Sequence, residues 1–308
     1  MRETQLVRLL QELFPGRRGT LLANGDDAAV LRTTSATAVT VDTQTENVHF
    51  YWSWASARAL GRRLVGVTLS DLAAVGALPR HGVLSLTVPR ELSSRRLKAY
   101  LQGVRQRAAA EKFEIVGGDV TAGPDFAAVL TALGAAPQSL LRRDRARKGD
   151  WLCVTGPLGG AAFELRGLLS GRRVRAAHWL EPPSRLAIGR RLARTPGVHA
   201  AMDISDGLFL DSRRLAEASG LGACIELERI PVDRRVGKMP TGAAKKSWLG
   251  LVGGGEDYEL LVCVDPNTAV PRGLTPIGRM VARGFSVTAD GCRLGWPRAG
   301  YLHGALRD

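Results

Sequence analysis

The sequence has few of the residues that would indicate a redox, metal-thiolate or membrane protein. Its four cysteines are far apart, without a CxxC pair, which argues against a zinc ribbon or a disulfide framework. Three of them lie in apolar stretches such as WLCVTG and LLVCV, so buried free thiols are expected. No run approaches the roughly 18 apolar residues of a membrane-spanning helix, and the N-terminal MRETQLVRLLQELF lacks the apolar core of a signal peptide. A cytoplasmic protein is therefore predicted.

Aromatic residues and lysine are also scarce. Aromatics make up 6% of the chain, and only six of the 43 basic residues are lysine. The formal net charge of +14 by itself suits nucleic-acid binding, because clustered cations release counterions from phosphates. The arginines are spread over most of the chain, however, and no aromatic residues are interleaved with them. We interpret the charge as a solvated surface that attracts anionic substrates, with a basic nucleic-acid-binding protein as an alternative.

Length and hydrophobic patterning predict two α/β domains. A chain of 308 residues with 45% hydrophobic content is long for a single core. In the first half, small and apolar residues from Ser56 to Ala77 predict one helix, and residues 93–112 predict a second. β-branched or alternating segments predict the strands of this half, which are TAVTVDT, GVLSLTV, FEIVGGD and FAAVLTALGAA.

The basic segment LRRDRARKGD is predicted to join the domains, which gives residues 1–140 and 141–308. The second half continues with alternating strands and helices, and VDRRVGKMPTGAAKKSWLG is expected to be a loop or a short helix. Its predicted helices are 159–170, 182–195 and 207–219, and its predicted strands are 151–155, VHAAMDIS, ACIELE, YELLVCV and TPIGRM.

VGGDVTAGPD, residues 116–125, resembles a phosphate-binding loop without its lysine. Gly117 and Gly118 would let backbone amides approach a ligand, but Asp119 would repel a bare phosphate. A cation between the carboxylate and the phosphate would resolve this conflict. Further aspartates stand at predicted strand ends, in a helix of small residues, or beside glycines, namely Asp26, Asp27, Asp42, Asp71, Asp203 and Asp206.

These carboxylates indicate a magnesium and phosphate site. Groups at the carboxyl ends of strands converge in open α/β sheets, and Mg²⁺ prefers oxygen ligands. The sequence has no His or Cys cluster that would favour zinc. A single GGD or SDG is usually a plain turn, and SDGL before a helix is also an ordinary N-cap. The metal site is favoured because several aspartates stand at such turns and strand ends, and not because of any single one.

Seven segments follow one another in a fixed order: GDDAAVL, VDTQTENVHF, TLSDLAAVGALP, VGGDVTAGP, VTGPLGG, MDISDGL and GGGEDYELL. They resemble the thiamine-monophosphate kinase family of the aminoimidazole ribonucleotide synthetase superfamily, from about residue 20 to the C-terminus. The resemblance implies an α/β fold of α+β type with two domains, and a homodimer in which the N-terminal sheets pair into a barrel. It implies an N-terminal domain that binds ATP and Mg²⁺ and dimerises, beside a C-terminal α/β domain.

The implied reaction is ATP-dependent phosphorylation of thiamine monophosphate to thiamine diphosphate by direct in-line transfer. No catalytic base is predicted, because the acceptor phosphate is already ionised and the transfer needs alignment and charge neutralisation. The resemblance implies Mg²⁺ ligands at Asp27, Thr40, Asp42, Asp71, Asp119, Asp203 and Asp206. It implies ATP contacts at Gly118, Asp119, Arg143 and Ser205, and thiamine contacts at His49, Glu256 and Tyr301.

Several alternatives stay open. Arg142 or Arg145 are alternatives to Arg143 as the phosphate clamp. Tyr301 could instead dock the C-terminal tail, as aromatic residues near a C-terminus more often do. The chain departs from the family pattern in having Val41 and Thr68 where Thr and Asn are common, and Gly160 where Asp is common. Selenophosphate synthetase, a superfamily relative, would need an early reactive cysteine, and none precedes residue 153. Another ATP-using relative with a different acceptor is the main alternative.

Overall fold

The computed structural model of the chain describes residues 12–13, 20–22, 30–31, 36–172, 174–175 and 177–297. The chain divides into two compact units. Unit 1 comprises Met1–Leu72 and Ala77–Gln138, and unit 2 comprises Ala73–Gly76 and Ser139–Asp308. In the part of the chain that is described, no helix has both the length and the apolar character needed to cross a bilayer.

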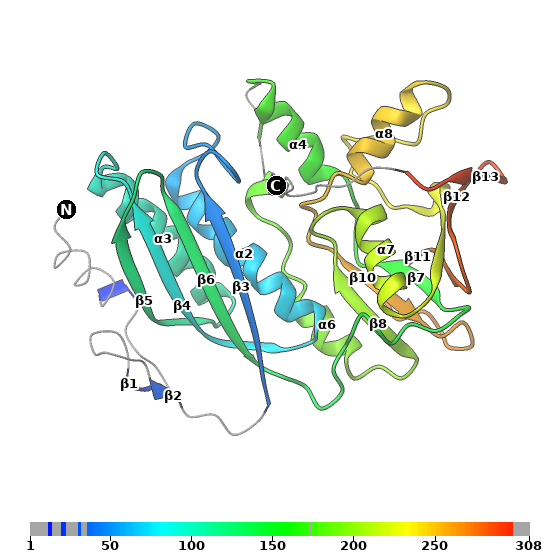
Figure 1. The fold of residues 1–308 in the computed structure, drawn as a ribbon, viewed down its shortest axis with the longest axis horizontal. Helices are drawn as coiled ribbons and strands as arrows, with labels where there is room; N and C mark the ends of the chain where they lie inside the picture. Colours follow the sequence, from blue (N-terminus) through cyan, green and yellow to red (C-terminus); the bar gives the residue numbers. More distant parts are fainter. Residues whose placement is uncertain are drawn as a thin grey trace, which may run out of the picture. The chain divides into compact units, whose positions relative to one another are not determined.

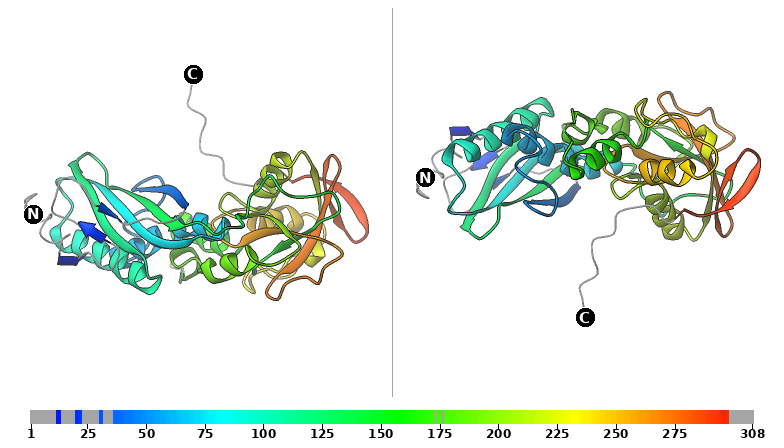
Figure 2. Two further views of the ribbon diagram at one scale, coloured as in Figure 1. Left: turned by 90° about the horizontal axis from the view of Figure 1, so that it is seen from below. Right: turned by 90° about the horizontal axis from the view of Figure 1, so that it is seen from above.

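Unit 1 is built on a four-stranded sheet with the strand order β3-β6-β4-β5. β6 is antiparallel to both of its neighbours, and β5 is parallel to β4. Two helices lie on one face of the sheet, as Figure 1 shows and as Figure 2 shows from below and above. The bounds are β3 Thr37–Thr45, α2 Ala57–Ala74, β4 Leu78–Val88, α3 Ser94–Ala110, β5 Glu114–Ala122 and β6 Ala127–Ala135, with a separate short pair β1 Thr20–Leu22 and β2 Val30–Leu31.

Alternation along the strands gives this sheet one covered face and one open face. On β6, Ala128, Leu130 and Ala132 are fully buried, whereas the residues between them are only half-buried. On β3, Val39 and Val41 point to the other face and are 63% and 58% exposed. Period-2 alternation in AAVLTALGA therefore predicts the buried face correctly. The described strands form open sheets, and no closed barrel is found among them.

Unit 2 contains a seven-stranded sheet with the order β13-β12-β9-β11-β7-β10-β8. Only β12 and β9 are parallel, and the other neighbouring strands are antiparallel. The strands are β7 Trp151–Val154, β8 Val198–Asp203, β9 Gly222–Glu226, β10 Leu260–Val264, β11 Thr275–Val281, β12 Phe285–Ala289 and β13 Cys292–Gly295. The helices are α4 Gly160–Leu169, α5 Ala177–Leu180, α6 Leu186–Leu192, α7 Leu208–Ala218, the 3-10 turn Leu227–Arg229 and α8 Ala244–Val252.

The core of unit 2 lies between this sheet and the helices packed on it. Phe209 and Leu215 of α7 and Trp248 of α8 belong to one buried cluster with residues of β7, β8 and β9. All four cysteines are free, with Cys153 and Cys263 buried. Buried thiols were expected at these two positions, and burial raises the pKa of Cys153 to about 12.

Two expectations about strand ends are wrong. VGGDVTA is not a loop, because β5 continues through it to Ala122, with Gly118 opposite Leu84 and Asp119 opposite Ser85. A Cβ at Gly118 would lie 1.9 Å from the carbonyl oxygen of Leu84, so this glycine serves the close approach of two strands. Asp42 likewise lies inside β3, which runs on to Thr45. Glycine pairs alone do not distinguish a tight strand contact from a loop.

Candidate functional site

The predicted ligands of β3 and α2 lie on the helix-covered side of the unit 1 sheet. Thr40 Oγ1 donates a hydrogen bond of 2.5 Å to Asp71 Oδ2, near the C-terminal end of α2. Asp42, two residues farther along β3, lies on the same face of the strand as Thr40, and all three are half-buried. The structure therefore brings the predicted ligands Thr40 and Asp71 into direct contact.

Asp119 lies apart from this group. One row of paired residues crosses the sheet from Asp42 through Leu130 and Leu84 to Gly118. Three interstrand steps of roughly 4.8 Å separate the ends of the row by about 14 Å. Asp119 follows Gly118 on the edge strand, is exposed, and points to the opposite face. Asp42 and Asp119 are therefore too far apart to ligate one ion within a single copy of unit 1.

The segment after β3 fixes the orientation of His49. The backbone N–H of Thr45 donates to His49 Nδ1 at 3.0 Å, so the neutral ring carries its proton on Nε2. Asn47, with φ of 65°, donates from Nδ2 to Asp125 Oδ1 at 3.1 Å. Phe50 is buried in an edge-to-face contact with Trp52. His49 is therefore held in one orientation by a well-packed turn, with Nδ1 as an acceptor.

In unit 2, the segments 203–207 and 253–259 lie side by side. The backbone N–H of Glu256 donates to Ser205 O at 2.7 Å, and that of Tyr258 donates to Ile204 O at 2.9 Å. Gly207 has φ of 121°, and a Cβ there would lie 2.0 Å from Gly253 O. These contacts hold the backbone of Glu256 against that of Ser205.

Glu256 has an unusual backbone conformation. Its φ of 67° is left-handed, which costs a non-glycine residue about 1 kcal/mol or more. Tyr258, two residues on, is also left-handed, with φ of 51°. The hydrogen bonds to the neighbouring segment hold both residues in this conformation. Such conformations concentrate at ligand-binding sites, which supports Glu256 as a functional residue.

Asp206 is held from two directions. Its backbone N–H and that of Gly207 each donate to Asp211 Oδ2 at 2.9 Å. Its carboxylate accepts a hydrogen bond from Arg214, which also contacts Asp211. Asp211 is fully buried, and burial raises its pKa to about 6 despite these donors. Asp203, at the end of β8, is also buried.

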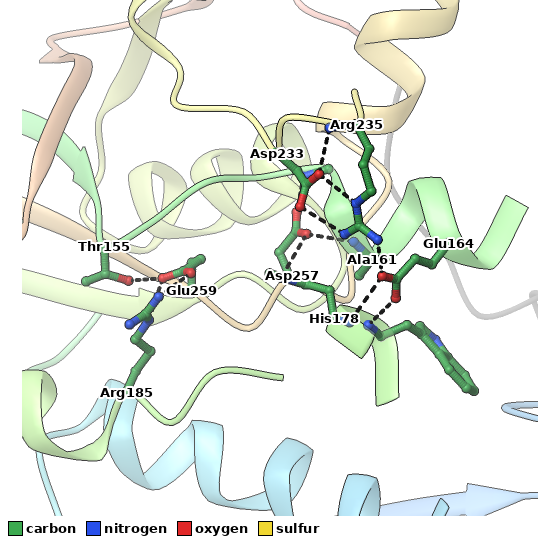
Figure 3. A network of polar contacts seen from close by, with 11 residues as sticks. Thr155, Ala161, Glu164, His178, Arg185, Asp233, Arg235, Asp257 and Glu259 are labelled. Atoms are coloured by element: carbon green, nitrogen blue, oxygen red, sulfur yellow. Dashed lines mark hydrogen bonds and ion pairs between the residues drawn. The ribbon is translucent and has the colours of Figure 1, made fainter. Parts of the chain in front are cut away.

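Two buried carboxylates support the segment that carries Glu256 (Figure 3). Asp257 accepts the backbone N–H groups of Gly159 at 2.7 Å and Ala161 at 3.3 Å, at the start of α4. Burial raises the pKa of Asp257 to about 7. Glu259 accepts two hydrogen bonds from Arg185, at 2.6 and 2.5 Å. Both carboxylates are fully buried, whereas Glu256 beside them is only half-buried.

A second part of this network explains Gly160. Arg235 pairs with Asp233 and with the buried Glu164 (Figure 3). A Cβ at Gly160 would lie 2.8 Å from Asp233 Oδ2, so the Asp233 carboxylate fills the space that a side chain at position 160 would enter. The groove next to it has a volume of about 720 Å³ and is lined by Pro157, Ala177, His178, Glu181, Val232, Asp233, Arg234 and Arg235.

Of the three candidate arginines, Arg143 is the one whose guanidinium has no side-chain partner among the described residues. Arg142 is engaged by Asp144 through two hydrogen bonds, at 2.8 and 2.5 Å, and Arg145 also approaches this carboxylate. Arg143 is exposed, and none of the described residues pairs with its guanidinium. The pattern favours Arg143 over its neighbours for an anionic ligand. Asp26, Asp27 and Tyr301 lie outside the described residues.

The described residues contain no group of three His, Cys, Asp or Glu side chains that is close enough to hold a metal ion. The predicted ligands are divided between the two units, and Asp27 is not described. Sequence reasoning also missed the supporting residues Asp211, Arg214, Asp257 and Glu259. The repeated acidic residues in SDGLFLD and GEDYE were the available signal, because Asp211 and Asp257 follow the predicted ligands at short spacing.

Comparison with models of known protein families identifies the superfamily of this chain. Residues 25–136 match the AIR synthase related protein, N-terminal domain, and residues 147–284 match the AIR synthase related protein, C-terminal domain. The two matches cover both units and define a two-domain α/β protein of this superfamily.

Comparison with individual proteins shows which family of this superfamily the chain belongs to. The thiamine-monophosphate kinase of Halobacterium salinarum is 34% identical over 88% of this chain and 93% of its own. The crystal structure of thiamine-monophosphate kinase from Stenotrophomonas maltophilia is 32% identical, with a TM-score of 0.78 over 93% of this chain and 95% of that one. AaThiL complexed with AMPPCP and TMP is 28% identical, with a TM-score of 0.77 over 99% of both chains. The chain belongs to the thiamine-monophosphate kinase family.

Proposed function

We propose that this chain transfers the γ-phosphoryl group of ATP to the phosphate of thiamine monophosphate, which gives thiamine diphosphate and ADP. Similarity to AaThiL, whose structure holds AMPPCP and TMP, carries this proposal. AMPPCP is an ATP analogue whose terminal phosphate is not transferred, so that complex pairs a nucleotide with the acceptor. The resemblance spans nearly the full length of both chains, and it includes both units.

The donor set of the candidate residues fits Mg²⁺. Thr40 and Asp71 contribute only oxygens, as do Asp42, Asp119 and Asp206. Hard oxygen ligands without thiolate or imidazole suit Mg²⁺ rather than zinc. We propose that Asp27, Thr40, Asp42, Asp71, Asp119, Asp203 and Asp206 hold several Mg²⁺ ions. When bound, these ions would neutralise the charge of the two phosphate-bearing reactants.

The nucleotide is proposed to contact Gly118, Asp119, Arg143 and Ser205. Arg143 offers an exposed guanidinium, which binds phosphate oxygens through charge-assisted hydrogen bonds. The thiamine moiety is proposed to contact His49 and Glu256, together with Tyr301. The fixed Nε2–H of His49 and the carboxylate of Glu256 give it one donor and one acceptor. No residue is needed as a general base, because the attacking oxygen belongs to an ionised phosphate.

The open face of the unit 1 sheet supports a proposal about assembly. Val39 and Val41 expose apolar surface on a regular sheet face, which is costly unless it is covered. We propose that two copies pair these faces into a shared barrel, so that the protein is a homodimer. A cytoplasmic location also stays a prediction.

The test is an acceptor assay. The purified chain is incubated with ATP and Mg²⁺ plus either thiamine monophosphate or thiamine, and the products are separated by chromatography. We expect thiamine diphosphate from the monophosphate and no phosphorylation of thiamine. Transfer to a different acceptor would assign the chain to another activity of the superfamily. Tight, salt-sensitive binding to nucleic acid, with no transfer to either compound, would support the nucleic-acid alternative.

A further inference from the structure

Asp211 and Arg214 connect the backbone of Asp206 to its own side chain through a closed set of contacts. Asp211, one turn into α7, accepts the backbone N–H groups of Asp206 and Gly207 through Oδ2. Its other oxygen, Oδ1, lies 2.9 Å from Arg214 Nη1. The same Nη1 donates a hydrogen bond to Asp206 Oδ2. A single buried carboxylate therefore fixes both ends of Asp206.

This closed set of contacts constrains one oxygen of Asp206 and leaves the other accessible. Oδ2 is engaged by a cation that is itself anchored by Asp211, which is fully buried. Among the described residues, none donates a hydrogen bond to Oδ1, and the Asp206 side chain is 20% exposed. Protein contacts therefore hold Asp206 through Oδ2, while its second oxygen, Oδ1, has no donor among the described residues.

Two roles are compatible with a guanidinium between two carboxylates. Arg214 either competes with a metal ion for Asp206 or orients Asp206 for that ion. Competition would require Arg214 to engage both oxygens of Asp206 or to be easily displaced. Instead it engages one oxygen and is held by a second, buried carboxylate. Carboxylates that ligate metals are themselves commonly oriented by hydrogen bonds from a surrounding layer of residues.

We propose that Asp211 and Arg214 are positioning residues, which orient Asp206 Oδ1 toward Mg²⁺. The inference rests on the proposed function for the identity of the ion. Both residues act through Asp206 rather than by touching a substrate. Loss of such a supporting residue typically weakens metal affinity by about 10- to 100-fold, which sets the expected effect.

The experiment follows thermal unfolding of the full chain while MgCl₂ is raised, with no nucleotide or thiamine monophosphate present. Arg214→Gln should need about 10- to 100-fold more Mg²⁺ than the wild type for half of the stabilising shift. Arg214→Lys keeps the charge and should recover part of the affinity, and it replaces Arg214→Gln if that variant does not fold. Arg213→Gln is the matched control, because Arg213 lies on the same helix but has other partners, Glu217 at 3.5 Å and the ring of Phe285.

A double-mutant cycle separates an effect transmitted through Asp206 from a general loss of structure. In an Asp206→Asn background, Arg214→Gln should cause no further change in the Mg²⁺ midpoint, because the oriented oxygen is already altered. An unchanged midpoint in Arg214→Gln would overturn the proposal, and so would a lowered midpoint, which would indicate competition. A wild-type chain that Mg²⁺ does not stabilise would also overturn it. Failure to form thiamine diphosphate would refute the proposed function alone, since this midpoint requires neither substrate.

Discussion

The two units position their candidate site residues by different physical means. In unit 1, Thr40 and Asp119 stand on strands of a regular sheet, so strand register sets their places and few other side chains support them. In unit 2, Ser205 and Glu256 stand on segments with left-handed or glycine-dependent backbone, held by fully buried carboxylates such as Asp257. Substitutions at the candidate site residues are therefore expected to change stability little in unit 1 and strongly in unit 2.

The largest effect on stability is expected from Glu259→Gln. The change removes the charge that pairs with Arg185 in a fully buried position, and it leaves the arginine without its partner. Breaking a buried pair from one side costs about 3 kcal/mol or more. Urea unfolding measures the loss. Glu217→Gln, in an exposed pair with Arg213, should change stability by less than about 0.5 kcal/mol, and equal effects of the two changes would contradict this view of unit 2.

A somewhat smaller loss is expected from Gly207→Ala. Its φ of 121° disfavours a side chain, and the added Cβ would lie 2.0 Å from Gly253 O, which forces the two segments apart. We expect a cost above about 2 kcal/mol. Gly220→Ala is the control, because Gly220 is left-handed, with φ of 69°, but has no atom within 4 Å of the added Cβ. If the two variants lose the same amount of stability, the predicted clash between the segments does not contribute to the effect of Gly207→Ala.

A pH-dependent effect is expected at Asp257. Folding raises the pKa of this carboxyl from 3.8 to about 7, chiefly through burial, so the folded protein binds its proton more tightly than the unfolded chain does. The contribution of Asp257 to stability is therefore most favourable below about pH 4, falls as the pH rises toward 7, and is constant above that. Asp257→Asn should flatten this part of the profile. Melting temperatures between pH 4.5 and 8 test it, and parallel profiles for the two proteins would refute it.

The smallest effect on stability is expected from Asp119→Asn, because Asp119 is exposed on an edge strand. The same change should lower the rate of transfer at limiting Mg²⁺ by at least about tenfold, since it removes the charge proposed to hold Mg²⁺. Glu114→Gln is the matched control on the same strand, where Glu114 lies 3.8 Å from His81. A full rate in Asp119→Asn at limiting Mg²⁺ would rule out its role.

Local patterns were sufficient to predict most elements. The alternation in AAVLTALGA and the β-branched TAVTVDT predict β6 and β3, and both are confirmed. Ser93 caps α3, where its Oγ accepts the N–H of Arg96 at 3.3 Å, as the helix start near residue 93 requires. The glycines before Asp119 wrongly predict a loop, because Gly118 serves a close contact with Leu84 on another strand. That contact has no signature in local sequence.

The site was predicted less completely than the fold for the same reason. Ser205 and Glu256 were named from motifs, and the structure brings them together through backbone hydrogen bonds. The role of Asp257 depends on Gly159, which lies 98 positions earlier in the chain. A buried carboxylate at the start of a distant helix leaves no spacing rule in the sequence. The repeated acidic residues of GEDYE mark Asp257 in the sequence, but its partner at Gly159 becomes visible only in three dimensions.

The most direct test of the central claim, that carboxylates of both units serve one transfer reaction, is the rate of thiamine diphosphate formation from ATP and thiamine monophosphate. Wild type, Asp119→Asn and Asp206→Asn are compared at the same Mg²⁺ concentration, with melting temperatures recorded to show that each is folded. We predict that both folded variants lose most of the activity. A folded Asp206→Asn protein that keeps the wild-type rate would contradict the claim and confine the chemistry to unit 1.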